Sequence, residues 1–115
     1  MTYEVLVAIL ESFDLPVAYD HFAEGNAPNP PFICYLNPRD NAFYADDKVY
    51  YQSQSIDIEV YTDRKDVDLE TRIERKLNEN NLCFTKDENW INTEKLYQVV
   101  YSVDVDLDEY IEREE

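Results

Sequence analysis

The segment from residue 30 to residue 77 constrains the fold most, because two strand patterns and a helix pattern follow one another within it. Residues 32–36 form a continuous apolar run, which is typical of a strand buried on both faces. After a polar loop at 37–47, a second strand is predicted at 48–62, where apolar and acidic side chains alternate in the second half. This order favours a hairpin followed by a helix within a mixed α and β domain.

Two amphipathic segments predict the helices. The first covers residues 2–13, with Thr2 as its N-cap, and the second begins after the N-cap Asp66 and ends at Asn80 and Asn81. Asparagine suits a helix end because it tolerates the left-handed conformation. The apolar stripes consist of Val5, Leu6, Ile9 and Phe13 in the first helix and Leu69, Ile73 and Leu77 in the second.

The remaining sequence completes an α+β fold. Residues 82–91 lead through a turn near 92–94 into a strand at 95–105, whose strict alternation is the strongest strand pattern in the chain. Residues 17–22 predict a short extended piece. We therefore expect two helices packed on a mostly antiparallel sheet of four strands, or slightly more, in the order α-β-β-α-β-β.

One domain is expected over residues 1–115, ending in a short acidic tail at 106–115. One face of the second strand carries apolar residues in the second half of the strand. In the first half, the same face carries Tyr50, Gln52 and Gln54. Either a bulge shifts the alternation there, or a hairpin at 37–55 projects beyond the sheet.

The charge of the chain is strongly negative, with 26 acidic residues against ten lysines and arginines and a net charge of −16. Such a surface repels nucleic-acid phosphates and anionic membranes, so we expect neither as a partner. No apolar run approaches the roughly 20 residues that span a bilayer, and Met1 leads directly into an amphipathic segment. The chain is therefore expected to stay in the cytosol.

Glycine and cysteine usage narrows the chemistry. Gly25 is the only glycine, whereas phosphate-binding loops and nucleophile elbows need several. Cys34 and Cys83 lie in apolar, strand-like runs with no metal-binding spacing, so both are expected to be buried free thiols. We expect no enzyme activity and no cofactor.

Two groups of residues contain side chains that can bind a metal ion, but a structural explanation is favoured for both. His21 and Glu24 could share an ion, but no second ligand lies nearby in the sequence. A calcium loop could begin at Asp104 as its position one. Its positions three, five, eight and twelve would then be Asp106, Asp108, Ile111 and Glu115. Glu109 replaces the glycine that this loop needs for its turn, so a strand running into a solvated acidic tail explains the same residues.

Over most of its length, about residues 17–103, the chain resembles the small tail-completion proteins of tailed bacteriophages and prophages. The likeness rests on NAPNPPFICYL, NAFYADDKVYYQSQSIDIEVYTD, DVDLETRIERKLNENN and EKLYQVVYSV. The chain is similar to the tail terminator and head–tail joining group. This resemblance implies a ring, expected to have six subunits, that caps the head-proximal end of the tail tube, with assembly in the host cytoplasm. It implies no catalytic residues.

The hairpin is the expected interface of such a ring, because arginine and aromatic side chains are enriched at protein contacts. The candidate interface residues are Arg39, Phe43, Tyr44, Tyr50 and Tyr51. The expected partners are further copies of the chain, the tail tube protein and the head–tail connector proteins, while DNA passes through the lumen without sequence-specific binding.

Two other functions stay open. One is a head-completion or connector-stopper protein of the same particle, because fold discriminates poorly among such parts. The other is a small acidic DNA mimic that occupies the basic groove of a nucleic-acid enzyme, which the net charge of −16 would suit.

Overall fold

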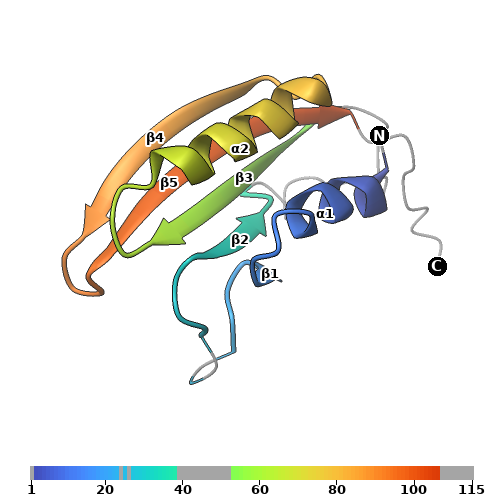
Figure 1. The fold of residues 1–115 in the computed structure, drawn as a ribbon. Helices are drawn as coiled ribbons and strands as arrows, with labels where there is room; N and C mark the ends of the chain where they lie inside the picture. The colour runs from blue at the N-terminus through green and yellow to red at the C-terminus, as the bar shows by residue number, and fades with distance from the viewer. Residues whose placement is uncertain (1, 24, 26, 39–52, 107–115) are drawn as a thin grey trace.

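The computed structural model describes residues 2–23, 25, 27–38 and 53–106, and the architecture is α+β (Figure 1). The strands are β1 (Val17–Tyr19), β2 (Phe32–Leu36), β3 (Ser53–Thr62), β4 (Phe84–Ile91) and β5 (Leu96–Asp106). In the described part of the chain they form one five-stranded sheet in the spatial order β1-β2-β3-β5-β4. β1 is parallel to β2, and the other neighbouring pairs are antiparallel.

Both helices begin at the N-caps that the sequence predicts. α1 (Tyr3–Glu11) starts where the Val5 amide donates a 3.1 Å hydrogen bond to the Thr2 hydroxyl. α2 (Val67–Glu79) starts where the Leu69 amide donates a 3.0 Å hydrogen bond to the Asp66 carboxylate. Each cap satisfies an amide that the first turn of a helix leaves without a partner.

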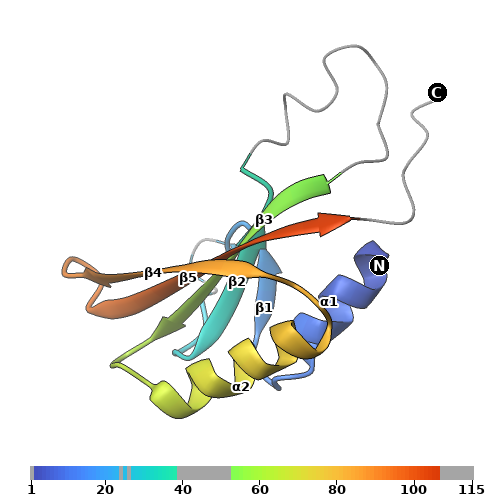
Figure 2. The same ribbon diagram turned by 90° about the horizontal axis from the view of Figure 1, so that it is seen from above.

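The core lies between the sheet and the two helices, which cover the same face of the sheet (Figure 2). Ile58 of β3 pairs with Tyr35 of β2 and with Tyr101 of β5, and all three side chains are buried. Leu10 of α1 and Ile73 of α2 are fully buried in the same cluster. The strand alternation and the stripe of the second helix therefore meet as predicted.

The predicted stripe of the first helix is wrong at one residue. Val5 is 46% exposed, because the buried side of α1 follows the helical spacing of Leu6, Ile9, Leu10 and Phe13.

The sheet has one strand more than the four that define the predicted order. The short extended piece predicted at 17–22 is the edge strand β1, in which Val17 pairs with Ile33 and the Ile33 amide donates to the Pro16 carbonyl at 2.9 Å. A parallel pair needs a connection of about a dozen residues, and residues 20–31 provide it. Three residues are too few to show an alternation, so only their pairing reveals them as a strand.

Several predictions fall outside the described residues. The structure describes β3 from Ser53 onward, so the projecting hairpin at 37–55 stays a prediction for residues 39–52. The acidic tail at 106–115 is described only at its first residue. Among the described residues, no helix combines the length and the apolar character that crossing a membrane requires.

Candidate interaction surface

One face of the sheet is left uncovered by the helices. Side chains alternate between the two faces of each strand, and the buried residues Ile58 and Tyr101 mark the helix side. On β3, β5 and β4 the opposite face therefore carries polar and acidic side chains. They include Asp57, Glu59, Tyr61, Gln98, Ser102, Asp104, Thr85, Asp87 and Asn89. In Figure 2 both helices lie on one side of the sheet, so neither helix covers this other face, which we call the open face.

Hydrogen bonds connect the polar side chains of this face across three strands. Asn89 Nδ2 donates to Gln98 Oε1 at 3.2 Å, and Gln98 Nε2 donates to the Tyr61 hydroxyl at 2.9 Å. Tyr61 in turn donates to Glu59 Oε1 at 2.9 Å. This series of hydrogen bonds runs from β4 through β5 to β3, so it links side chains of three strands across the open face.

We call Asp57, Glu59, Asp87 and Asp104 the acidic face. All four point to the uncovered side of the sheet, and no lysine or arginine of the described strands joins them there. Burial and the nearby carboxylate of Asp57 raise the pKa of Glu59 above its usual range, although the hydrogen bond from Tyr61 opposes this. The face therefore concentrates negative charge with no compensating cation of its own strands.

The β2 side of this face is apolar. The ring of Phe32 stacks on Tyr61 at 5.0 Å and meets the edge of Phe22 at 5.4 Å. Cys34 lies in the same strand and is 4% exposed, and burial together with the charge of Glu59 raises the pKa of its thiol to about 11. The prediction of a buried strand at 32–36 is thus confirmed.

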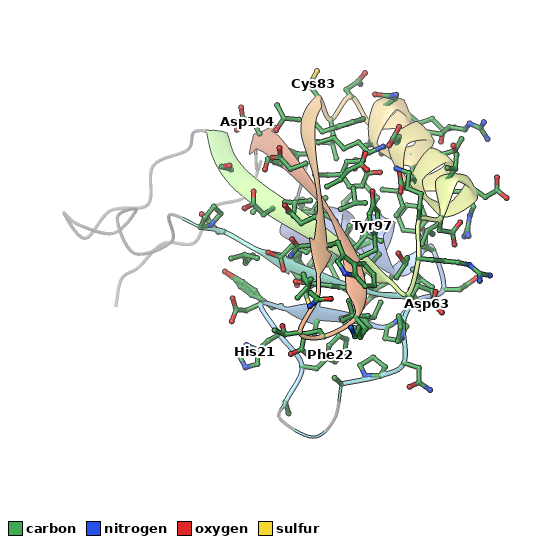
Figure 3. The ribbon with its side chains drawn as sticks, turned by 90° about the vertical axis from the view of Figure 1, so that its left-hand side faces the viewer. His21, Phe22, Asp63, Cys83, Tyr97 and Asp104 are labelled. Carbon is green, nitrogen blue, oxygen red and sulfur yellow. The ribbon has the colours of Figure 1, made fainter. Side chains whose placement is uncertain are left out.

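The prediction for the second cysteine is wrong. Cys83 is exposed, because it follows the end of α2 and precedes the edge strand β4. Its apolar neighbours Leu82 and Phe84 do turn inward, and these two residues gave the sequence its buried appearance. Figure 3 shows Cys83 at the opposite end of the molecule from His21.

A network of charged side chains occupies the helix side of β4. Lys86 Nζ lies 2.8 Å from Glu70 Oε1 and 2.7 Å from Glu74 Oε2. Lys65 Nζ lies 2.9 Å from Glu70 Oε1 and 3.1 Å from Glu88 Oε1. The Glu70 side chain is only 6% exposed, so the two ammonium groups compensate a carboxylate that would otherwise be costly to bury.

Two tyrosines of β5 complete this network. The Tyr101 hydroxyl donates to Glu74 Oε2 at 2.8 Å, and Tyr97 donates to Glu88 Oε1. Burial opposes ionisation of Glu74, but hydrogen bonds from Lys86 and Tyr101 outweigh it and lower the pKa of that carboxyl. The hydrogen bond from Tyr97 is the main cause of the lowered pKa of Glu88. Figure 3 shows Tyr97 and Asp104 toward opposite ends of β5.

The sequence did not predict this network. Glu70 lies in the first turn of α2, where interaction with the helix dipole is enough to explain an acidic residue. Lys86 is the residue that could have indicated the network. It lies within β4 and pairs with the buried Tyr101 of β5, so it is on the helix side of the sheet. A lysine on the core side of a strand is rarely buried unless a carboxylate pairs with it.

The candidate sites named from the sequence come out as follows. The interface residues Arg39, Phe43, Tyr44, Tyr50 and Tyr51 all lie outside the described residues.

His21 Nδ1 lies 2.7 Å from the carboxylate of its neighbour Asp20, and both side chains are exposed, while Glu24 is not described. Asp104 and Asp106, which would be positions one and three of a calcium loop, both belong to β5. Within the described ranges no cluster of potential metal ligands occurs.

No family model, no curated protein and no solved structure matches this chain.

Proposed function

We propose that this chain is a structural subunit of a tailed bacteriophage or prophage particle. In this proposal a ring of subunits caps the head-proximal end of the tail tube, ends tube polymerisation and joins the tail to the head connector. The observation that carries the proposal is the open sheet face. Both helices lie on one face of the sheet, and the other face carries polar side chains that are joined by hydrogen bonds. This second face gives the small domain a broad surface for contacts with other proteins.

The charged groups on the helix side support a structural role. Lys65, Lys86, Glu70, Glu74 and Glu88 bind one another between α2 and β4. Their hydrogen bonds stabilise the packing of a helix on an edge strand. We therefore assign them to the fold and propose no reaction for them.

Electron microscopy of an induced lysate tests the proposal. The strain would carry a prophage from which the coding sequence of this chain has been deleted, and a plasmid copy of the chain would provide the control. We expect overlong tails without heads, because no ring ends the growth of the tube, and normal tails when the plasmid copy is present. Tails of normal length beside full, unjoined heads would instead assign the chain to head completion or to a connector stopper.

The acidic face also favours one function of another class, a DNA mimic. Asp57 and Glu59 are two residues apart on β3, and Asp87 and Asp104 extend the negative surface over β4 and β5. Such a surface would suit the basic groove of a nucleic-acid enzyme. Intact, infectious particles from the deletion strain would refute the structural role and favour the mimic.

A further inference from the structure

Two buried apolar residues of β2 lie outside the core that the helices cover. Phe32 is 8% exposed and Cys34 is 4% exposed, but neither belongs to the main core cluster. Both side chains point to the open face, because Ile33 and Tyr35 of the same strand point to the helix side. Neither helix covers the open face (Figure 2), so the cover over these two residues comes from elsewhere in the chain.

The connection between β1 and β2, residues 20–31, provides this cover, and we call it the strap. The ring of Phe22 meets the ring of Phe32 edge to face, with 5.4 Å between the ring centroids. Burial is the main cause of the raised pKa of the Cys34 thiol, and nearby carboxylates, that of Asp20 among them, add to it. Asp20 and Phe22 thus place the first residues of the strap over β2.

Few contacts hold the strap to the rest of the chain. At its start, the Asp20 amide donates to the Tyr35 carbonyl at 2.7 Å. From residue 22 to residue 31, the described residues make no backbone hydrogen bond, and most of their side chains are exposed. Phe22 is the one large apolar side chain of the strap. A segment with so few buried contacts and backbone hydrogen bonds opens at a lower free energy than the whole fold.

We propose that the strap opens as a local unit while the sheet and the helices stay folded, and that its opening uncovers Phe32 and Cys34. The ring of Phe32 stacks on Tyr61 at 5.0 Å, so the uncovered apolar area is continuous with the polar side chains of the open face. An apolar centre with polar surroundings is typical of protein interfaces. The strap therefore controls how much apolar surface the open face offers to another protein. This last step rests on the proposed function, in which the open face makes the contacts of a structural subunit.

Reaction of the Cys34 thiol with a disulfide reagent tests the opening, in the full chain carrying Cys83→Ser. The reagent reaches Cys34 either when the strap opens or when the whole chain unfolds. The two routes differ in their dependence on urea, because the surface that an opening exposes determines how strongly urea favours it. We expect a rate that is almost independent of urea at low concentrations and rises steeply only near the unfolding transition. A rate that follows global unfolding at every urea concentration would overturn the inference.

Phe22→Ala in the same background tests whether the strap is the part that opens, and Phe84→Ala is its matched control. Each substitution removes a half-buried ring that meets another ring edge to face, Phe32 at 5.4 Å or Tyr101 at 5.2 Å. Phe84 packs against the main core on the helix side, away from the strap. We expect Phe22→Ala to raise the urea-independent rate by about tenfold or more, and Phe84→Ala to leave it unchanged. Equal rates in the two variants would also overturn the inference.

The outcome is independent of the deletion experiment. Local opening in the purified chain combined with normal tails from the deletion strain would retain the strap and refute the tail function. Overlong tails combined with a Cys34 rate that follows global unfolding would have the opposite meaning.

Discussion

Lys86 Nζ lies 2.8 Å from Glu70 Oε1, although Lys86 belongs to the edge strand β4 and Glu70 to the first turn of α2. The pair joins the helix layer to the edge of the sheet through a carboxylate that is almost fully buried. It also fills the inward side of β4 with charge, which makes this edge unsuitable for pairing with another strand.

Replacing Lys86 should destabilise the fold. Lys86→Met removes one of the two cations that contact Glu70 and also leaves Glu74 with Tyr101 alone. Because Lys65 still binds Glu70, we expect a loss of about 2 kcal/mol in the free energy of unfolding, measured by urea titration. Lys95→Met, in the exposed turn, should change it by about 0.5 kcal/mol or less. Equal effects of the two substitutions would contradict a structural role for the network.

An apolar replacement of the pair should expose the edge of the sheet. Lys86→Ile combined with Glu70→Leu removes the most buried carboxylate together with its cation. Glu74 loses Lys86 but keeps the hydrogen bond from Tyr101, so part of the lost stability should return. The inward side of β4 then has no charge to prevent pairing between sheet edges. We expect faster aggregation, measured by light scattering and thioflavin fluorescence, than for Lys86→Met. Equal aggregation of the two variants would show that Lys86 does not protect the edge.

The acid dependence of stability should follow Glu74. Its pKa in the folded protein lies below the ordinary value of 4.5, so its contribution is present above about pH 4.5. This contribution is lost as the pH falls through the folded pKa, because protonation breaks the contact with Lys86. Unfolding free energies from about pH 7 to about pH 3 should therefore fall less steeply for Lys86→Met than for the unchanged chain. Parallel curves would exclude Lys86 as the partner.

Removing the charge of Glu59 should stabilise the isolated chain. Its folded pKa is raised, so the folded state loses stability as the pH rises from the unfolded pKa to the folded one. Glu59→Gln keeps an oxygen that accepts the hydrogen bond from Tyr61 and should raise the unfolding free energy at neutral pH by about 0.5 kcal/mol. Glu94→Gln makes the same chemical change in the turn after β4. A larger gain from Glu94→Gln would mean that total charge, rather than the acidic face, controls the effect.

The two thiols should react at very different rates. Cys83 is exposed, whereas Cys34 is buried and its pKa is raised to about 11. Because the thiolate is the reactive form, a disulfide reagent should modify Cys34 at least about a hundredfold more slowly than Cys83 in the native chain. Cys83→Ser should show only the slow phase, and a fast phase in that variant would contradict the burial of Cys34.

Local sequence patterns were sufficient for the helices and for most of the sheet. Thr2 and Asp66 cap the helices as predicted, because capping depends on residues within one turn. The strand at 95–105 also matches β5 closely, because alternation over many residues identifies both its type and its buried face.

Other features depend on residues far apart in the sequence. For β1 the sequence predicts only a short extended piece, because its strand character comes from pairing with β2. The sequence predicts a buried Cys83, although the residue is exposed, because the apolar residues beside it dominate the local pattern. The periodicity of apolar residues does not show which polar side chains contact one another. Lys65, Glu70 and Lys86 therefore could not be predicted to form a network, because only the packing of α2 on β4 brings them together.

The sequence by itself determined the strong negative charge. It also determined the α+β class and the starts of both helices, because propensity, capping and periodicity act over short distances. Only the tertiary structure decided that both helices cover the same face and that Asp57, Glu59, Asp87 and Asp104 share the other. The physical reason is that strand pairing and helix packing select the neighbours of each side chain. Charges separated by many residues therefore form a network on one side of the sheet and an uncompensated surface on the other.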